Sequence, residues 1–422
     1  MTHAKSRLLL LSATLFVWAC SPPADTSGVG VTAFEGARLI TGDGSVVEDA
    51  VVLVDGGLIT AAGASADIDI PGGATSVDLS GKTVMPALVN AHFHLASTEA
   101  ERTEQLQHLA YYGAGAALSL GLDEGPVGLE MRSTQIPNGA RSQSAGRGIT
   151  SPEPGRSEVP FWVTTEEEAR TAVQELAASN VDIVKVWVDD RGGQYERLSP
   201  ELYGAVIDEA HQNGLRVTAH VFTLEDAKGL LRAGIDAFAH GIRDQDVDDE
   251  LVELWQSRPE VVLVPNLPGP GVASDLGWLG GTVPAAQLQE MQEGAVDRPA
   301  AQEAFGIQAR NLVRLHEAGI KVAFGTDGGA PWSVHQELED MVRAGLPEST
   351  VLTAATSSAA QLMELNDVGM VAPGYSADFL VLNGNPLQDI TETRNISDVY
   401  LAGQKVEREA LATQFLQQEP AS

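Results

Sequence analysis

Residues 84–94 read VMPALVNAHFH, an apolar run that leads directly into two histidines separated by one residue. The run Val84–Asn90 is typical of a buried strand. Alternate side chains of a strand lie on the same face, so His92 and His94 are expected to point the same way. Two imidazoles on one face at the end of a strand can bind one metal ion. A single pair of this kind is more often incidental, so the assignment depends on the rest of the chain.

Four further residues with ligand-type or charged side chains fall at similar places: His220 after Leu215–Ala219, His240 after Ile235–Ala239, Asp327 after Ile320–Thr326, and Lys185 within Val181–Val188. The carboxyl ends of parallel strands meet at one face of an α/β barrel, so these side chains are expected to converge there. Neutral imidazoles and a carboxylate are the ligands expected for zinc or a similar divalent ion. A bare ammonium at Lys185 would be costly to bury, unless it points outward or snorkels to solvent.

Helix signals separate these predicted strands. Thr165 with Glu168 forms a capping box, Ser199 precedes Pro200 at the start of another helix, and Thr223 caps a third. Repeated strand–helix units favour a closed parallel (β/α)8 barrel over an open doubly wound sheet. We predict this α/β barrel, of the TIM type, over residues 84–369.

The two ends of the chain have a different pattern, with short alternating strands and turn residues. The pairs Asp43-Gly44 and Asp55-Gly56 are hairpin signals in the first part. Residues 377–382 and 399–406 are strand-like in the last part. We therefore expect residues 31–83 and 370–410 to form one small β-sandwich domain, followed by a C-terminal tail at 411–422.

The first thirty residues indicate export. Lys5 and Arg7 precede the apolar run Leu8–Trp18, which is too short to span a bilayer and is typical of a signal peptide over residues 1–19. Cys20 then stands where a bacterial lipoprotein is lipidated, and residues 20–30 are predicted to be a tether. A plain signal peptide with an incidental cysteine is the alternative. The interpretation is a periplasmic or cell-envelope lipoprotein anchored at Cys20.

The charge and the cysteine content of the chain exclude several classes of function. The chain has 422 residues, with 58 acidic and 26 basic side chains and a formal charge of −32. This balance excludes a chain-wide nucleic-acid surface, and membrane attachment is expected only through the lipidated cysteine. One cysteine in the chain excludes an internal disulfide framework and multi-cysteine metal sites. A small molecule is therefore the expected partner. The sequence does not decide whether the chain forms a homo-oligomer.

Three motifs together resemble the amidohydrolase superfamily, in the group of imidazolonepropionase-like and prolidase-like enzymes. Residues 78–86, leading to His92-Phe93-His94, resemble its entry motif, and Gly325–Gly329 resembles its eighth-strand motif. Gly369–Pro386 resembles its return into the β domain. The resemblance covers roughly residues 31–410 and concerns fold and metal chemistry, not the substrate.

The resemblance implies a role for each predicted ligand. His92 and His94 would bind one divalent metal ion and His220 and His240 a second, and the ligand types indicate zinc for both. Asp327 would bind the first metal and act as general base and then acid. Lys185 corresponds to a lysine that such enzymes convert to an N6-carboxylated bridge between the metals. If Lys185 points outward instead, a single metal is expected.

Substrate contacts are less specific. Arg191 and Arg243 follow two of the predicted strands and Asn266 ends another, so all three should lie near the mouth of the site. Arginine can hold a carboxylate bidentately, although pairing with Asp189, Asp190, Asp244 or Asp246 is the alternative. His335 could support a ligand or contact the substrate.

The interpretation is a metal-dependent hydrolase of an amide or peptide C–N bond, with a dipeptide, N-acyl amino acid or cyclic amide as substrate. An esterase or lactonase would use the same centre. A deaminase is less favoured, because no glutamate stands shortly after His220, where Val221-Phe222-Thr223 follow. A non-catalytic substrate-binding lipoprotein is expected to lack at least one metal ligand, whereas all six predicted metal ligands are present in this sequence.

Overall fold

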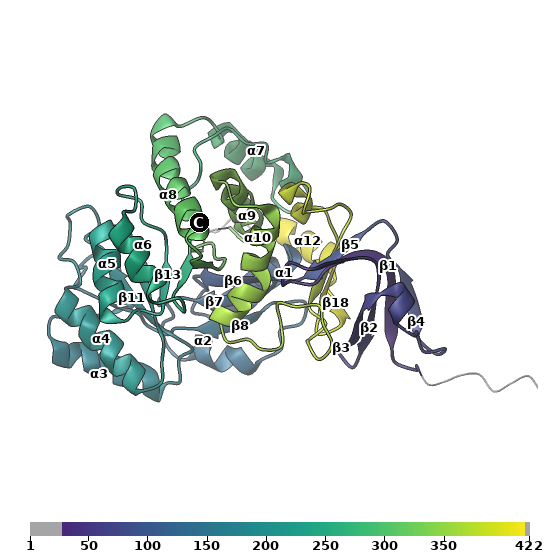
Figure 1. Cartoon of the computed structure of the whole chain (residues 1–422), viewed down its shortest axis with the longest axis horizontal. Helices are drawn as coiled ribbons and strands as arrows, with labels where there is room; N and C mark the ends of the chain where they lie inside the picture. The colour runs from purple at the N-terminus through teal and green to yellow at the C-terminus, as the bar shows by residue number, and fades with distance from the viewer. Residues whose placement is uncertain (1–27, 329, 418–422) are drawn as a thin grey trace, which may run out of the picture.

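The computed structural model describes residues 28–328 and 330–417, and combines one mixed sheet, two further sheets built mainly of parallel strands, and the helices that cover them (Figure 1). The predicted signal peptide, Cys20 and most of the tether lie outside these residues. Within them, no helix has both the length and the apolar character needed to cross a membrane.

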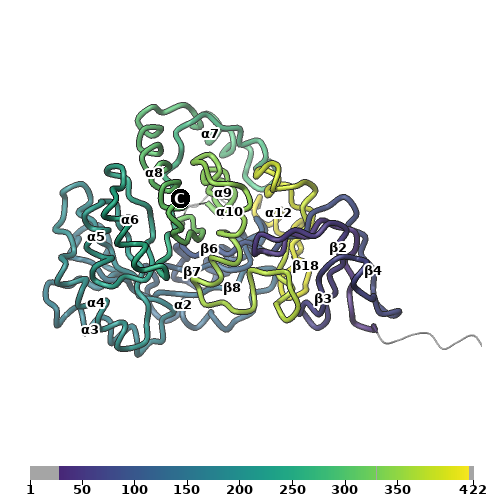
Figure 2. The backbone as a smooth tube through the Cα atoms, in the orientation of Figure 1, coloured from purple at the N-terminus to yellow at the C-terminus, as the bar shows by residue number. Residues whose placement is uncertain are grey.

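Strands from both ends of the chain form one eight-stranded sheet. Its path order is β18 (Gln404–Lys405), β17 (Ile396–Leu401), β16 (Phe379–Leu382), β5 (Thr83–Pro86), β1 (Thr32–Ile40), β2 (Val46–Asp55) and β3 (Leu58–Ala64), with β4 (Thr75–Asp78) beside β1. Purple and yellow segments therefore lie side by side in Figures 1 and 2. The Asp55-Gly56 hairpin is confirmed, because Asp55 pairs with Leu58 across it.

Two further sheets, whose strand pairs are parallel, carry the middle of the chain. One contains β6 (Leu88–Phe93), β7 (Ala114–Ser119) and β8 (Arg141–Ser144). The other runs through β10 (Phe161–Trp162), β9 (Ile149–Thr150), β11 (Val184–Val188), β12 (Val217–Val221), β13 (Ala237–Ala239), β14 (Val262–Val264) and β15 (Lys321–Val322). Backbone hydrogen bonds join the two sheets at two places, from Ala91 of β6 to Phe324 after β15 (2.9 Å) and from Asp182 before β11 to Ser144 of β8 (3.0 Å).

The prediction of one strand over Val84–Asn90 is wrong. The chain forms β5 and then β6, and these two strands belong to different sheets. Pro86 ends β5, and Ala87 donates its N–H to Asp378 in the terminal sheet before β6 begins. The terminal sheet therefore extends beyond residue 83, through Pro86.

Helices follow the parallel strands, and the predicted caps are confirmed. Thr165 forms the capping box of α3 (Glu166–Ala178), Ser199 caps α4 (Pro200–Gln212), and Thr223 caps α5 (Leu224–Ala233). The remaining helices are α1 (Glu99–Tyr111), α2 (Val127–Glu130), α6 (Asp249–Gln256), α7 (Ala285–Gly294), α8 (Pro299–Glu317), α9 (Ser333–Ala344), α10 (Glu348–Thr353), α11 (Ala359–Leu362) and α12 (Arg408–Gln417).

The chain forms helix α12 from Arg408 to Gln417, so the tail expected at 411–422 begins within this helix. Leu411 and Phe415 are buried, and the Phe415 ring lies 3.6 Å from the His108 ring of α1. The apolar spacing of four residues places both side chains on the face that meets α1. Residues 411–417 are therefore part of the packed structure.

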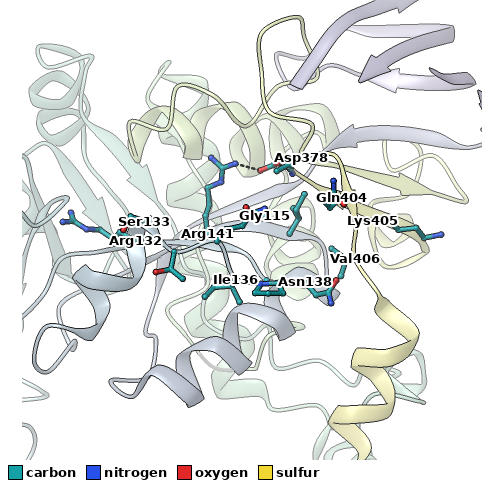
Figure 3. A pocket seen from close by; sticks show the side chains of 16 residues that line it. Gly115, Arg132, Ser133, Ile136, Asn138, Arg141, Asp378, Gln404, Lys405 and Val406 are labelled. Atoms are coloured by element: carbon teal, nitrogen blue, oxygen red, sulfur yellow. Dashed lines mark hydrogen bonds and ion pairs between the residues drawn. The ribbon is translucent and has the colours of Figure 1, made fainter. Parts of the chain in front are cut away.

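An ion pair links the terminal sheet to the parallel strands. Arg141, at the start of β8, donates to Asp378 (3.0 Å) just before β16, and also pairs with Asp367 (2.9 Å). Figure 3 shows this contact at the edge of a cavity of about 540 Å³. The cavity lies at the amino-terminal ends of β7 and β8, which is the end opposite to the predicted ligands.

Candidate metal centre

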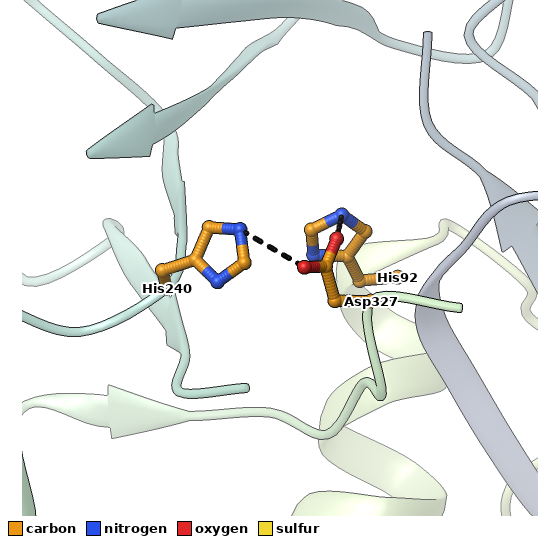
Figure 4. Close-up of side chains that lie close together, drawn as sticks. All are labelled: His92, His240 and Asp327. Atoms are coloured by element: carbon orange, nitrogen blue, oxygen red, sulfur yellow. Dashed lines mark ion pairs between the residues drawn. The ribbon is translucent and has the colours of Figure 1, made fainter. Parts of the chain in front are cut away.

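Three predicted ligands from distant parts of the chain meet at one point (Figure 4). His92 is the penultimate residue of β6, His240 follows β13, and Asp327 lies in the segment after β15. Asp327 Oδ1 lies 3.0 Å from His92 Nε2, and Asp327 Oδ2 lies 3.6 Å from His240 Nε2. One ligand atom from each residue can be chosen so that all three lie within 4.8 Å of one another.

His94 and His220 extend this group. His94 Nε2 lies 3.2 Å from Asp327 Oδ1, and the His92 and His94 rings are 5.4 Å apart, so both imidazoles face the carboxylate as the alternation of the strand predicts. The His220 ring lies 4.5 Å from the His240 ring. The structure therefore brings all four histidines and Asp327 together.

Close backbone approach and left-handed backbone conformations help to form the centre. At Gly325 an added Cβ would lie 2.7 Å from His92 Cβ, so only glycine lets the segment after β15 approach β6 this closely. His240 (φ 100°), Asn266 (φ 43°) and Asp327 (φ 60°) all adopt positive φ. Such residues are uncommon and cluster at functional sites, where the surrounding contacts hold them.

Lys185 lies in β11 and is fully buried. Its Nζ has no hydrogen-bond partner among the described residues and lies 5.5 Å from the Trp187 ring centroid. Burial lowers the pKa of Lys185 to about 7, against the attraction of Asp327. The alternative that Lys185 snorkels or points to solvent is therefore wrong.

The buried imidazoles are in the neutral form that binds metals. Burial, reinforced by Lys185, lowers the pKa of His92 to about 4, and burial holds the pKa values of His220 and His240 well below the ordinary value. Burial raises the pKa of Asp327, but the neighbouring histidines, His92 above all, outweigh it and keep that pKa below its usual range. At neutral pH the site presents neutral imidazoles and a carboxylate.

The donor set fits a divalent cation. Asn266 Oδ1 lies 2.8 Å from His92 Nδ1, and an amide oxygen only accepts, so Nδ1 carries the ring proton. The lone pair of Nε2 then faces the Asp327 oxygen at 3.0 Å, with no proton between the two acceptors. His92 Nε2 and His240 Nε2 are both buried without a hydrogen-bond partner among the described residues. A cation between these atoms would satisfy all of them.

A cavity of about 330 Å³ opens beside the metal centre. Its lining includes three predicted metal ligands (His94, His220, Asp327), the predicted substrate residue Arg191, and two apolar side chains, Leu122 and Trp187. Arg156 and Ser157 also line it, and the sequence analysis missed both. They lie in the loop after β9, where no hydrophobic periodicity marks them, although a position after a parallel strand was a usable criterion.

The predicted substrate arginines have different surroundings. Arg191 Nε donates to Glu153 (2.9 Å) and its Nη1 to Asp189 (2.8 Å) and to His220 Nε2 (3.2 Å), so the pairing alternative with Asp189 is confirmed. Glu153 is buried and also accepts from Arg156 (2.6 Å), so two guanidinium groups share it.

Arg243 lacks a carboxylate partner among the described residues. Its guanidinium lies 3.5 Å from the Phe222 ring centroid, and its Nη2 is 3.4 Å from His240 Nδ1. The nearby acids are engaged elsewhere, since Asp244 accepts from the Leu224 N–H and Asp246 pairs with Arg310. Burial lowers the pKa of Arg243 to about 10, which still leaves it charged at neutral pH.

His335 lies in a different cluster from the four histidines of the metal centre. It is buried on α9, its Nδ1 is 3.2 Å from Thr393 Oγ1, and its ring is 5.8 Å from the Trp278 ring and 6.2 Å from the Tyr112 ring. These contacts join α9 to the segment before β17. The structure thus gives His335 a packing environment between the parallel strands and the terminal sheet.

Comparisons with known proteins agree with this geometry. The model of the amidohydrolase family matches residues 156–406. The imidazolonepropionase of Deinococcus radiodurans is 27% identical over 395 residues, covering 86% of this chain and 93% of that protein. Ochratoxinase of Aspergillus niger is 24% identical over 450 residues, covering 90% and 87%.

Among solved structures, a putative prolidase from Bifidobacterium longum superposes with a TM-score of 0.75 at 28% identity, covering 92% of this chain and 99% of that chain. The chain therefore belongs to the amidohydrolase family, and it is a hydrolase that acts on C–N bonds. The fold is mixed α/β with parallel sheets.

Proposed function

We propose that this chain is an exported metal-dependent amidohydrolase that cleaves an amide or peptide bond. The observation that carries the proposal is the apposition of His92 Nε2 and His240 Nε2 with the Asp327 carboxylate, three acceptors that need a cation. Family membership supports the same chemistry.

Two divalent ions, zinc by ligand type, fit the six residues. His92, His94 and Asp327 would hold one ion and His220 and His240 the other. Lys185 would bridge both as an N6-carboxylated lysine, because carboxylation replaces a buried ammonium by an anion next to cations. Bound divalent ions supply Lewis acidity that lowers the pKa of water and polarises a carbonyl group.

The residues of the chain supply proton transfer and exclusion of water. Asp327 is ionised and its side chain is 41% exposed, so it can accept a proton from the attacking water. The same carboxyl group then donates that proton to the leaving amine nitrogen as the C–N bond breaks. Trp187 and Leu122 form an apolar wall that limits the access of other water.

The charges around the cavity favour a substrate with a carboxylate. Arg156, Arg191 and Arg243 provide three guanidinium groups, whereas Glu153 and Asp189 provide two compensating carboxylates. One positive charge is left for a ligand, and arginine binds carboxylates bidentately. A dipeptide or an N-acyl amino acid meets this requirement, and Asn266 Nδ2, buried and without a partner among the described residues, is a further donor for it.

Ester or lactone hydrolysis is the second candidate, because the same centre and the same general base serve a C–O bond. The leaving group distinguishes the two reactions. An amine needs the proton that Asp327 returns, whereas an alkoxide of low basicity needs it less. A small loss of ester hydrolysis and a large loss of amide hydrolysis in Asp327→Asn would therefore assign the amide reaction.

We also propose the wider organisation of the chain. Strands β6–β8 and β11–β15 close into an eight-stranded barrel, which the hydrogen bonds from Ala91 to Phe324 and from Asp182 to Ser144 support. The terminal strands form a separate β domain, and His335 supports the junction rather than the substrate. Residues 1–19 act as the signal peptide and Cys20 as a lipid anchor in the cell envelope.

An activity screen tests the proposal. Zinc-loaded protein is assayed against dipeptides and N-acyl amino acids, and against the same compounds with the carboxylate amidated. Hydrolysis that needs the free carboxylate, and that Arg243→Met loses while Arg310→Met keeps, supports the proposal. Arg310 is the matched control because it is exposed and pairs with Asp246. Equal hydrolysis of the amidated compounds would refute carboxylate recognition.

A further inference from the structure

The segment from Val264 to Leu267, which begins with the last residue of β14, touches two of the proposed metal ligands. The N–H of His240 donates to Val264 O (2.9 Å), and the N–H of Gly241 donates to Pro265 O (3.1 Å). Asn266 then places its side-chain oxygen 2.8 Å from His92 Nδ1. The conformation of these four residues therefore affects both His92 and His240.

Two helices hold the segment from outside the centre. Glu337 of α9 accepts the Leu267 N–H with both carboxylate oxygens at 3.1 Å, and Gln308 of α8 donates to Pro265 O at 2.6 Å. Glu337, Gln308 and Asn266 are all buried. A buried polar group is costly unless it is hydrogen-bonded, so these side chains are fixed where the segment can use them.

We infer that Asn266 is a positioning residue that fixes the His92 tautomer for metal binding, and that Glu337 holds Asn266 in place. With its oxygen toward His92, Asn266 requires the proton on Nδ1 and leaves Nε2 free as a ligand atom. Asn266 has φ 43°, a conformation that asparagine tolerates better than most residues but that still needs outside support. The bonds to Leu267 and Pro265 on either side of it provide that support.

Two replacements of Asn266 distinguish the effect of its side-chain oxygen on His92 from the effect of its size. Asn266→Asp keeps an oxygen acceptor toward His92 Nδ1, whereas Asn266→Leu has similar size and no acceptor. Loss of a group that orients a metal-binding histidine typically costs about 10–100-fold in metal affinity. We therefore expect Asn266→Leu to weaken zinc binding by about that factor and Asn266→Asp to stay within about threefold of the wild type.

Glu337 is tested against a neighbour on the same helix. Glu337→Leu removes the acceptor for the Leu267 N–H and is expected to weaken zinc binding about tenfold, whereas Glu337→Gln keeps an acceptor and restores it. Asp340→Asn is the matched control. Asp340 is also a buried acid of α9, but its partner is Arg343 (3.7 Å) and not the segment after β14.

The readout is zinc affinity, measured by competition with a chelating indicator and without any substrate. Thermal unfolding of each metal-free variant shows that it is folded, and the ¹⁵N shifts of labelled histidine report the His92 tautomer. The inference rests on the proposed metal site, so a wild type that binds no zinc would end both proposals. If the wild type binds zinc and Asn266→Leu binds it equally well, or if Asp340→Asn weakens it as much as Glu337→Leu, only this inference fails.

Discussion

Replacing Lys185 with methionine should stabilise the metal-free protein while removing a ligand of the metal centre. The side chain is fully buried in β11, and burial lowers its pKa from 10.5 to about 7. The unfolded chain keeps this proton up to a higher pH than the folded chain does. Between these two pKa values the unfolded state therefore binds more protons, and wild-type stability rises with pH.

The size of the effect follows from the two pKa values. Each pKa unit corresponds to about 1.4 kcal/mol, so burial of the Lys185 amine costs about 4 kcal/mol at pH 7 and about 2 kcal/mol at pH 9. Methionine is apolar, has a similar length and does not titrate. The advantage of Lys185→Met over the wild type should shrink by about 2 kcal/mol between these pH values.

Urea unfolding of both proteins, with chelator present and bicarbonate absent, measures this difference at the two pH values. Lys405→Met is the control, because Lys405 lies in a partly exposed ion pair with Asp398 and should not reproduce the pH dependence. An advantage of Lys185→Met that stays constant from pH 7 to pH 9 would refute the buried-ammonium reasoning. A variant that is less stable than the wild type at both pH values would refute it as well.

Three further predictions concern catalysis, packing and pH. Asp327→Asn should reduce amide hydrolysis by at least about 100-fold in steady-state assays, with the fold intact, because the proton acceptor is lost. Phe415→Ala should cost about 3 kcal/mol of unfolding free energy by denaturant titration, whereas the exposed neighbour Leu416→Ala should cost less than about 0.5 kcal/mol. Burial raises the pKa of Asp340 to about 7, so the stability that this group contributes is lost as pH rises from about 4 to 7. Asp340→Asn should remove this loss, and an unchanged pH profile of the melting temperature would contradict the assignment.

The ligand positions could be predicted because they depend on local patterns. β13 has three residues, yet the apolar run before His240 indicated it. Asp327 also lies after its strand, although β15 ends at Val322 and not at Thr326 as expected. Strand direction and the common end of parallel strands then bring such residues together without any knowledge of side-chain contacts. The helix caps at Thr165 and Thr223 could also be predicted, because each depends only on residues up to three positions along the chain.

Other features depend on contacts between distant segments and had no local signal. Nothing in Val84–Asn90 shows that Pro86 pairs with Phe379 across the terminal sheet, so one strand was predicted where two exist. The pairing of Glu153 with Arg191 joins residues 38 positions apart. Asn266 was assigned to the substrate from its place after a strand, whereas its oxygen contacts a proposed metal ligand.

The central claim is that the convergent histidines, Lys185 and Asp327 act through bound metal. Metal-free protein can be titrated with zinc while hydrolysis of an N-acyl amino acid is followed. We predict no turnover without metal and a rise that levels off at about two equivalents of zinc per chain. Full turnover after exhaustive chelation would contradict the account.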